Sequence, residues 1–464
     1  MILALEHNTL AILLNLINNI SMSKPITIKN KIKNFKKKIS VEGDKSLSIR
    51  FALLASQALG KSKAYNLLRS EDVLNTLKCL KKLGISIKLT RKYCQIQGNG
   101  LNSYVYKNNL TLNAGNSGTA ARLICSTLLN STKEIKITGD NSLQKRDMKR
   151  IIEPLEKFGA SFKRNKGTLP LFIKGSNLIK PINYQEVLGS AQCKSAVMLG
   201  ALISAPGITK LKCKPSRNHT ELLFKHLKIP IKIKKTKKFD YIQIRGKHNF
   251  KSFNYKIPSD ISSAAFFLVL TLLSKDSQLI IKNVNINPTR TGIISILNMM
   301  GAKILLLNKR KYKGELIANI FVKSKKNLKA INCNKKLNST AIDEMLLLFL
   351  VSSVAKGVST YKGLEELNKK ESKRLDWGFK ILKMIGIKTK KISNHGIKIY
   401  GKPNLKLKKK YIIKNYLKDH RIFMVCVVAA MVLGGEWKIY NPESIKTSFP
   451  SFLQVIKKLG GKLN

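Results

Sequence analysis

The sequence Gly43-Asp44-Lys45-Ser46-Leu47-Ser48-Ile49-Arg50 lies between two apolar patterns of different period. Before it, Ile39 and Val41 alternate with polar residues, as in a strand, and after it the residues from 51 to 59 repeat with the period of a helix. The stretch therefore predicts a junction at which a strand ends, the chain turns at a glycine and a helix begins.

The side chains of this junction suit an anion. Free N–H groups and the positive end of the helix dipole point outward at a helix N-terminus, while Lys45 adds a point charge and Arg50 a planar set of donors. An ordinary helix start, with Asp44 or Ser46 as the N-cap and the cations in solvent, is an equally good interpretation. The residue order of a Walker A phosphate loop is absent from the stretch.

A second pattern recurs six times, in which a helical segment ends on an apolar residue, a glycine follows and a strand begins. The glycine position is held by Gly84, Gly159, Gly301, Gly386 and Gly460, and in one copy by Lys228. Glycine there is typical of a left-handed residue just after a helix, so Lys228 must adopt that backbone at a cost or end its helix differently. Six units of similar length predict two domains of three compact βα units.

The apolar periodicity also predicts individual elements. Helices are expected at 72–83, 148–158, 191–203, 262–273, 344–355 and 421–433, and strands at 134–138 and 278–284.

The composition sets broad limits. The chain has 464 residues, 44% of them hydrophobic, enough for two or more domains with buried cores. Its formal net charge of +62 admits nucleic-acid binding, anionic small substrates or the compositional drift of an AT-rich coding sequence. Lysine is spread over nearly every segment, for example at 36–38 and 408–410, which favours drift as the source of most of the charge.

Cysteine usage and the N-terminus indicate a compartment. Seven cysteines are scattered without a C-x-x-C pair or a Cys/His cluster, so we expect reduced thiols in a cytoplasm and no metal site. The apolar stretch at 10–17 lacks the flanks of a signal peptide and is too short to cross a membrane. We expect no membrane association, and we expect residues 1–21 to be a misannotated or disordered extension with Met22 as the start.

Two segments of the first half place small and polar residues before a helix. Residues 114–119 (Ala-Gly-Asn-Ser-Gly-Thr) precede a helical segment that carries Arg122. Small residues let backbone N–H groups approach an anion, and Arg122 is able to orient the loop, although a plain turn with a cap is the alternative. Residues 139–148 carry Arg146 just before another helix.

Two more segments combine hydroxyl, amide and guanidinium groups. Residues 190–196 (Ser-Ala-Gln-Cys-Lys-Ser-Ala) open a helix with groups that suit a phosphate and the hydroxyls of a ring, or that simply cap the helix. Residues 215–221 (Pro-Ser-Arg-Asn-His-Thr-Glu) offer Arg217.

The second half supplies acids. Ile342-Asp343-Glu344 and the charged run 365–374 place carboxylates on separate elements, with Lys370 and Arg374 on the second. Such acids beside cations suit proton transfer next to an anion. Since 24% of all residues are charged, a solvated charged helix is the alternative for 365–374.

Four further segments complete the series. Asp419-His420-Arg421 offers another arginine, and Lys446-Thr447-Ser448-Phe449-Pro450 lies near the end of the chain. The segments 258–266 and 287–292 are interpreted as scaffold near a boundary between domains.

In this order, the motifs resemble those of the EPSP synthases (3-phosphoshikimate 1-carboxyvinyltransferases), over about residues 39–462. The family patterns are G-D-K-S in one branch, G-N-A-G-T-x-x-R, G-D-x-S-L-x-x-R-P-M, S-A-Q-x-K-S-A, S-R-D-H-T-E, I-D-E, E-E-L-R-x-K-E-S-D-R, D-H-R and T-S-F-P. The resemblance implies an α+β (mixed α/β) fold of two similar domains, each of three βαβαββ units around a pseudo-threefold axis, with the active site in the cleft between them. The implied domains are 44–257 and 22–43 plus 258–464.

The resemblance also implies the reaction. The enolpyruvyl group of phosphoenolpyruvate would pass to the 5-hydroxyl of shikimate 3-phosphate by addition and elimination, with release of phosphate. No organic cofactor, metal or specific nucleic acid is implied, and a monomer is expected. A UDP-sugar enolpyruvyl transferase of the same fold and a basic nucleic-acid-binding protein are the alternatives.

The matching positions imply residue roles. The catalytic residues would be Asp343, Glu371 and Lys45. Shikimate 3-phosphate would be bound by Lys45, Ser46, Arg50, Ser190, Ala191, Gln192, Arg217, Asp343 and Lys370. Phosphoenolpyruvate would be bound by Lys45, Asn116, Gly118, Arg146, Gln192, Arg374, Arg421 and Lys446.

Four positions depart from the family patterns, namely Asp147 for proline, Asn218 for aspartate, Asn368 for arginine and Lys373 for aspartate. These departures change the charges around the expected active site, so they bear on its charge balance. Gly118 occupies the position where glycine leaves room for glyphosate, the inhibitor of the family, and where one branch has alanine. We therefore predict an inhibitor-sensitive enzyme.

Overall fold

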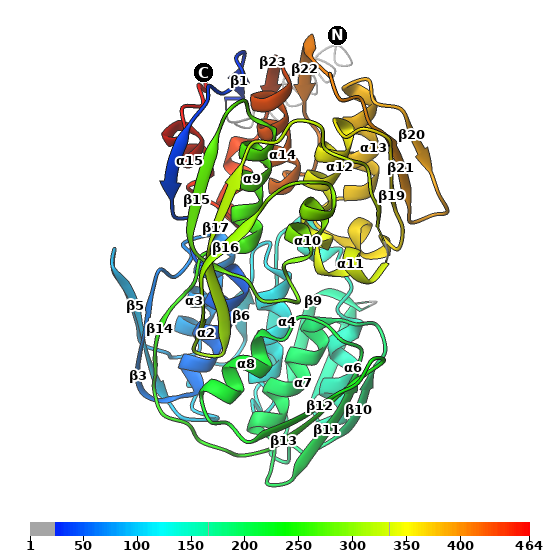
Figure 1. Ribbon diagram of the computed structural model, residues 1–464. Coiled ribbons are helices and arrows are strands. Elements are labelled where there is room, and N and C mark those ends of the chain that lie inside the picture. Colours follow the sequence, from blue (N-terminus) through cyan, green and yellow to red (C-terminus); the bar gives the residue numbers. More distant parts are fainter. Residues whose placement is uncertain (1–23, 166, 334) are drawn as a thin grey trace, which may run out of the picture.

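The computed structural model describes residues 24–165, 167–333 and 335–464, so the extension predicted at 1–21 and Met22 lie outside the described residues. The described chain forms two lobes, which lie one above the other in Figure 1. The first lobe runs from α2 (Lys45–Gln57) to β14 (Asn254–Lys256). The second lobe contains β1 (Ile26–Ile28), β2 (Lys36–Ile39) and the chain from α9 (Ile261–Leu273) onward.

Three mixed sheets of four strands form the first lobe, and they share one topology. In each sheet the first two strands are parallel, and the other two pair antiparallel beside them. The orders are β14-β3-β5-β4, β6-β7-β9-β8 and β10-β11-β13-β12. The strands are β3 (Leu59–Tyr65), β4 (Ile87–Leu89), β5 (Tyr93–Asn99), β6 (Leu110–Asn113), β7 (Ile135–Thr138), β8 (Ser161–Asn165), β9 (Thr168–Lys174), β10 (Asn183–Glu186), β11 (Ile208–Cys213), β12 (Ile231–Lys235) and β13 (Asp240–Arg245).

The second lobe repeats this arrangement with one difference. Its orders are β16-β17-β15-β2, β18-β19-β21-β20 and β1-β23-β22, so within the described residues the last sheet has three strands. The expected βαβαββ unit is therefore incomplete there, although Asn464 and Thr27 exchange two backbone hydrogen bonds at its edge. The strands are β15 (Gln278–Asn285), β16 (Leu305–Tyr312), β17 (Glu315–Lys323), β18 (Asn332–Cys333), β19 (Val358–Tyr361), β20 (Thr389–Lys391), β21 (Ile397–Tyr400), β22 (Leu407–Ile413) and β23 (Gly434–Ile439).

Helices connect the strands, and all eight elements predicted above are found within two residues of their expected ends. The helices of the first lobe are α2, α3 (Glu71–Lys82), α4 (Gly118–Thr127), α5 (Asn141–Gln144), α6 (Lys149–Lys157), α7 (Ala191–Ile203) and α8 (His219–His226). Those of the second are α9, α10 (Gly292–Met299), α11 (Lys335–Thr340), η1 (Ile342–Glu344), α12 (Met345–Ser353), η2 (Glu365–Lys369), α13 (Arg374–Met384), α14 (His420–Leu433), η3 (Pro442–Thr447) and α15 (Phe452–Lys458).

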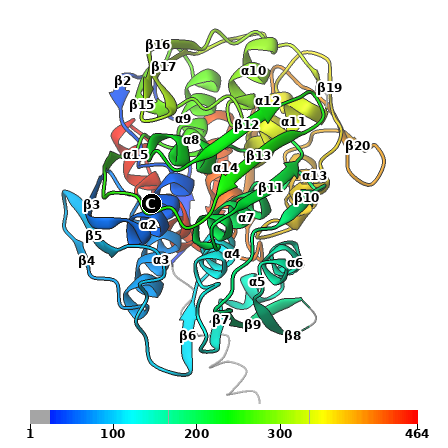
Figure 2. The ribbon, with the colours of Figure 1, turned by 90° about the horizontal axis from the view of Figure 1, so that it is seen from below.

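Three helices of each lobe are buried along most of their length and pack against one another. They are α2, α4 and α7 in the first lobe and α9, α12 and α14 in the second. Figure 2 shows the same molecule from below, with sheets around the helices. The hydrophobic core of the first lobe takes its residues from Leu47 to Ile257, and that of the second takes them from Ile28 to Val41 and from Ile261 to Leu459.

The recurring glycine has the backbone that its position predicts. Gly84 follows α3 with φ = 84°, Gly386 follows α13 with φ = 76°, and the other three glycines also have positive φ. Lys228 follows α8 with φ = 58°, so it adopts the left-handed conformation in spite of its side chain. The repeat is therefore a property of the backbone rather than of one residue type.

The two chain segments that join the lobes lie side by side. Gly43 forms a β-bridge with Ser259, and the amide of Asp44 donates to the carbonyl of Pro258 at 2.8 Å. A Cβ on Gly43 would collide with the carbonyl oxygen of Asn66, so only glycine fits. The Arg290 guanidinium lies between the carboxylates of Asp44 and Asp260, 3.3 Å from each, which places the segments 258–266 and 287–292 beside this crossing.

Candidate active site between the lobes

The buried helices of the two lobes direct their N-termini toward one region. The residues that meet there are the first residues of α2, α4, α7 and α14 and those of η1, which leads into α12. Because helix N-termini carry free N–H groups and a partial positive charge, this arrangement favours anions. The described residues of this region are also rich in lysine and arginine.

Lys45 stands in the first turn of α2. Its Nζ lies 2.9 Å from Oδ2 of the buried Asp72, the second residue of α3. Burial raises the pKa of Asp72, and Lys45 opposes this shift. Asp44 is the N-cap of α2, since its Oδ1 accepts from the amide of Leu47 at 2.9 Å. The capped-helix interpretation is thus correct for Asp44, while Lys45 has an acidic partner.

Arg50 is 5% exposed and joins three helices of the first lobe. Its Nε donates to Thr220 Oγ1 and its Nη2 to Ser195 Oγ, both at 2.8 Å. Its Nη1 donates to the carbonyl of the half-buried Ser46 at 3.2 Å. Burial lowers the pKa of Arg50 to about 10.

Arg146 follows α5 and is held by the loop before α4. Its Nη2 donates to Asn116 Oδ1 at 2.9 Å, and Asn116 Nδ2 donates to Asp140 Oδ2 at 2.6 Å. Gly118 begins α4 under two guanidinium groups. A Cβ there would lie 3.0 Å from Arg122 Nη1 and 3.3 Å from Arg146 Nη1.

The N-terminus of α7 faces α4. Ser190 is the N-cap, with its Oγ accepting from the amide of Cys193 at 3.2 Å, and Ala191 is half-buried beside it. Gln192 accepts from Arg122 Nη1 at 2.5 Å and donates to Thr119 Oγ1 at 2.8 Å.

Asp343 of η1 is surrounded by cations from both lobes. Its Oδ2 accepts from Arg217 of the first lobe, while its Oδ1 lies 3.3 Å from Lys370 Nζ and 3.8 Å from Arg374 Nη1. Its carbonyl accepts from Arg421 Nη1 at 2.7 Å. Burial alone would raise the pKa of Asp343, but Lys370, Arg217, Arg421 and Arg374 hold it well below the usual range of a carboxyl.

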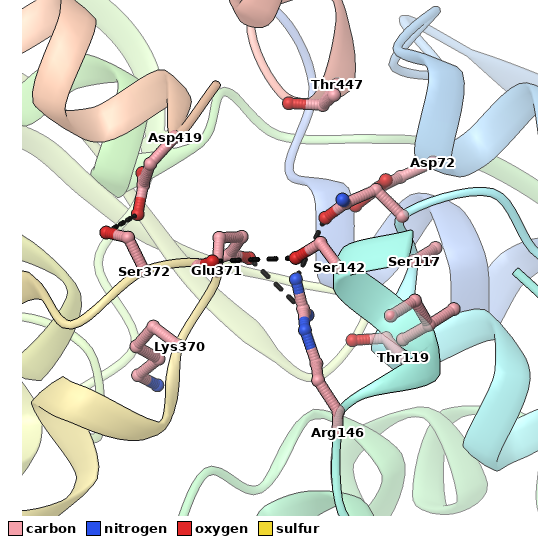
Figure 3. Close-up of polar contacts among 12 residues, drawn as sticks. Asp72, Ser117, Thr119, Ser142, Arg146, Lys370, Glu371, Ser372, Asp419 and Thr447 are labelled. Atoms are coloured by element: carbon pink, nitrogen blue, oxygen red, sulfur yellow. Dashed lines mark hydrogen bonds and ion pairs between the residues drawn. The ribbon is translucent and has the colours of Figure 1, made fainter. Parts of the chain in front are cut away.

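Glu371 lies between Arg146 and Arg374. Its Oε1 is 3.7 Å from Arg146 Nη1, and its Oε2 accepts from Arg374 Nη2. Figure 3 shows Arg146 and Ser142 directed at Glu371, with Ser372 and Asp419 at its other side. Burial opposes ionisation, yet Arg374 and Arg146 hold the pKa of Glu371 well below its usual range.

Arg374 is fixed by Asp419, the N-cap residue of α14. Its Nε donates to Asp419 Oδ2 at 2.9 Å and its Nη2 to Oδ1 at 3.1 Å, while Ser372 Oγ donates to Oδ2 at 2.8 Å. Neighbouring Arg421 lies 3.5 Å from Glu344 Oε1. Lys446 of η3 is exposed, and its charge acts on Glu71 of the first lobe.

The charged run 365–374 is only partly helical. It forms η2 up to Lys369, a non-helical stretch that includes Lys370 and Glu371, and the start of α13 at Arg374. A continuous solvated helix is therefore wrong for this run. Asp343 and Glu371 do lie on separate elements, as the sequence predicts.

The four departures from the family patterns have local partners or face solvent. Asp147 accepts from the amide of Lys149 at 2.8 Å and pairs with Arg150 at 3.6 Å. Asn218 accepts from Asn287 Nδ2 at 2.8 Å, and Asn368 accepts from the amide of Leu375 at 2.8 Å. Lys373 is exposed.

Sequence reasoning missed two acids in this region. Asp72 partners Lys45, and Asp419 fixes Arg374. An acid at the start of a helix is typical of an ordinary cap, so nothing local distinguishes them.

Two further observations concern the described residues only. They contain no group of His, Cys, Asp and Glu side chains arranged to hold a metal ion. No helix among them is both long and apolar enough to cross a bilayer.

Taken together, these contacts bring Arg146, Arg217, Arg374, Arg421, Lys45 and Lys370 from both lobes into one region with the carboxylates of Asp343 and Glu371. Guanidinium groups bind carboxylates and phosphates through paired donors. Carboxylates beside them are able to move protons to and from a bound molecule. The geometry therefore fits a reaction of anionic substrates with proton transfer.

Comparison with known proteins identifies relatives along nearly the whole chain. A family model described as EPSP synthase (3-phosphoshikimate 1-carboxyvinyltransferase) matches residues 29–456. The 3-phosphoshikimate 1-carboxyvinyltransferase of Ruthia magnifica subsp. Calyptogena magnifica is 39% identical, over 92% of this chain and 96% of that protein. The enzyme of the same description from Petrotoga mobilis is 37% identical, over 92% and 97%.

Solved structures give the same picture. An EPSP synthase from Acinetobacter baumannii superposes with a TM-score of 0.83 at 34% identity, covering 95% of this chain and 99% of that chain. The enolpyruvyl transferase NikO from Streptomyces tendae has a TM-score of 0.74 at 13% identity, over 95% and 98%, and so shares the fold.

Proposed function

The chain belongs to the EPSP synthase (3-phosphoshikimate 1-carboxyvinyltransferase) family, and we propose that the cations and carboxylates between its lobes perform the reaction of that family. This reaction is the transfer of the enolpyruvyl group of phosphoenolpyruvate to shikimate 3-phosphate. The enzyme is a transferase of the shikimate pathway, which leads to chorismate and the aromatic amino acids. The observation that carries the proposal is the meeting of Arg146, Arg374 and Glu371 at the boundary between the lobes.

Each of the two substrates brings a carboxylate and a phosphate to a region of many cations. We assign phosphoenolpyruvate to the side formed by Arg146, Arg374 and Arg421, and shikimate 3-phosphate to the side formed by Arg217 and Asp343. The further proposed ligands of phosphoenolpyruvate are Lys45, Asn116, Gly118, Gln192 and Lys446. Those of shikimate 3-phosphate are Lys45, Ser46, Arg50, Ser190, Ala191, Gln192 and Lys370.

The proposed chemistry has two stages. In the addition, Glu371 gives a proton to C3 of phosphoenolpyruvate while the 5-hydroxyl oxygen bonds to C2, and the hydroxyl proton passes to Asp343. In the elimination, the C2–O bond to phosphate breaks, the departing phosphate oxygen takes the proton held by Asp343, and a C3 proton returns to Glu371. Lys45 stabilises the departing phosphate oxygen. Exclusion of water by the lobes strengthens these contacts and protects the intermediate.

In the proposed reaction, Asp343 starts as the ionised acceptor and Glu371 as the protonated donor. Asp343 is ionised, as a proton acceptor must be. Glu371 is also ionised when Arg146 and Arg374 face it without a ligand. Once the anionic groups of phosphoenolpyruvate engage the same arginines, less positive charge acts on Glu371, so its pKa rises and it takes up the proton that it donates.

Domain closure fits the same arrangement. We propose that the domains are 44–257 and 22–43 plus 258–464, in support of which the two hydrophobic cores divide at these points. Ion pairs between Arg217 and Asp343 and between Arg146 and Glu371 cross from one lobe to the other. We further propose a cytoplasmic monomer.

The direct test is phosphate release. Purified enzyme should release phosphate from phosphoenolpyruvate when shikimate 3-phosphate is present, and Glu371→Gln should slow this release. A UDP-sugar in place of shikimate 3-phosphate is the control for the sister reaction. Release with the UDP-sugar alone would contradict the assignment.

A further inference from the structure

Arg122 is a buried cation to which the proposed reaction gives no role. It lies in the middle of α4 and is 8% exposed. Its Nη1 donates to Gln192 Oε1 at 2.5 Å and its Nη2 to the carbonyl of Asp147 at 2.7 Å. Among the described residues, no carboxylate lies within ion-pair distance of it.

This isolation is costly, because a buried charge without an opposite charge is destabilising. Burial and the neighbouring Arg150 and Arg146 lower the pKa of Arg122 to about 10, although the more distant charges of Asp147 and Glu366 oppose this shift. A neutral residue of the same size would avoid the repulsion. The guanidinium therefore needs a reason to be there, and its shortest hydrogen bond is to Gln192.

The contact decides which way the amide of Gln192 faces. The oxygen and nitrogen of a glutamine amide are interchangeable in shape, and only their hydrogen-bond partners distinguish them. Arginine donates and never accepts, so Arg122 selects the orientation with Oε1 toward itself. In that orientation Nε2 donates to Thr119 Oγ1 at 2.8 Å.

One N–H of Gln192 then remains for a ligand, since the described residues show Thr119 as the protein acceptor of this amide. With the opposite orientation, Gln192 would present an oxygen to anionic substrates and repel them. We propose that Arg122 is a positioning residue that holds Gln192 as a hydrogen-bond donor toward the substrates. This inference rests on the proposed function, in which Gln192 contacts both of them.

A double-mutant cycle tests the coupling of the two residues. Gln192→Ala should raise the KM for phosphoenolpyruvate about 10- to 150-fold, which corresponds to about 1.5–3 kcal/mol for a lost hydrogen bond to a charged group. Arg122→Met should raise this KM by a similar factor with a smaller effect on kcat. In the Arg122→Met background, Gln192→Ala should change KM by less than about twofold.

Three comparisons make the result specific. Arg150→Met removes a nearby guanidinium on α6 that does not contact Gln192, so its effect should multiply with that of Gln192→Ala. Gln192→Glu keeps a partner for Arg122 but removes the donor, and it should raise KM although Arg122 is intact. Arg122→Lys keeps a donor and a charge, and it replaces Arg122→Met in the cycle if thermal unfolding shows that the methionine variant does not fold.

If the effects of Arg122→Met and Gln192→Ala on KM multiply fully in the double variant, the positioning role of Arg122 is overturned. The proposed function is not affected by that result. A Gln192→Ala enzyme with unchanged KM would overturn both this role and the ligand assignment of Gln192. Absence of phosphate release from the wild type with both substrates would instead contradict the proposed function itself.

Discussion

Arg146 Nη1 in the first lobe lies 3.7 Å from Glu371 Oε1 in the second lobe. This pair links the region that we assign to phosphoenolpyruvate with the acid that we assign to its C3 proton. In the proposed mechanism, this one guanidinium couples binding of the substrate anion, closure of the lobes and protonation of Glu371.

Replacement of the acid tests its role. Glu371→Gln should leave the binding of both substrates largely intact, because shape is kept, while kcat falls by about 10²–10⁴-fold, the usual contribution of a general acid–base group. Calorimetry of binding and steady-state phosphate release measure the two effects. Turnover close to that of the wild type would remove Glu371 from the mechanism.

Proton uptake should accompany substrate binding. Glu371 is ionised in the free enzyme, so formation of the ternary complex should take up a proton as its pKa rises. Titrations in two buffers of different ionisation enthalpy measure this uptake, and Glu371→Gln should lose it. Equal apparent enthalpies in both buffers for the wild type would contradict the expected rise.

Substrate binding should be synergistic. In the proposed assignment, shikimate 3-phosphate contacts Arg217 of the first lobe and Asp343 of the second, so its binding should favour closure and bring Arg146 toward Arg374. Phosphoenolpyruvate should therefore bind more tightly when shikimate 3-phosphate is present. Calorimetric affinities that are the same with and without it would refute the two-lobe assignment.

Gly118→Ala should discriminate between the substrate and glyphosate. The new methyl would lie 3.0 Å from Arg122 Nη1 and 3.3 Å from Arg146 Nη1, so it crowds the anion pocket. The longer inhibitor should lose about 1–3 kcal/mol more than phosphoenolpyruvate. Inhibition and KM measured on both forms provide the test, and a resistant wild type or equal losses would show that Gly118 does not border the inhibitor.

Stability should fall in mild acid because of His420. Burial lowers the pKa of His420 to about 3 in the folded chain, while a histidine in the unfolded chain titrates near 6.5. The unfolded state therefore binds the proton first, and stability is lost as the pH falls from about 6.5 toward 3. Denaturant unfolding at pH 7 and pH 5 should show a smaller loss for His420→Gln than for the wild type, and identical losses would exclude this source.

Because the backbone at Lys228 is left-handed, we expect that glycine can replace this residue without loss of stability. Lys228→Gly removes a backbone cost of about 1–2 kcal/mol for a residue with a side chain, partly offset by the greater freedom of glycine in the unfolded chain. We expect a small net gain in the free energy of unfolding, measured with denaturant. Gly386→Ala is the matched control, since φ is 76° and no atom lies within 4 Å of the added Cβ, and it should be destabilising.

The sequence by itself determined the local features. Helix starts such as that at Asp44, the glycines that end helices and the periodicity of the buried helices all depend on residues a few positions apart, so the pattern of βα units was predictable. The motifs also identified the family, and with it the reaction.

The tertiary structure alone decided which charges meet. Arg217 and Asp343 are 126 residues apart in the chain, and nothing in either motif shows that they form an ion pair between the lobes. The sequence likewise did not show that Asp72 pairs with Lys45 or that Asp419 pairs with Arg374. It also did not show that Arg122 contacts Gln192. Ion pairs and amide orientations depend on distance and burial in space, and these are set only when the two lobes pack together.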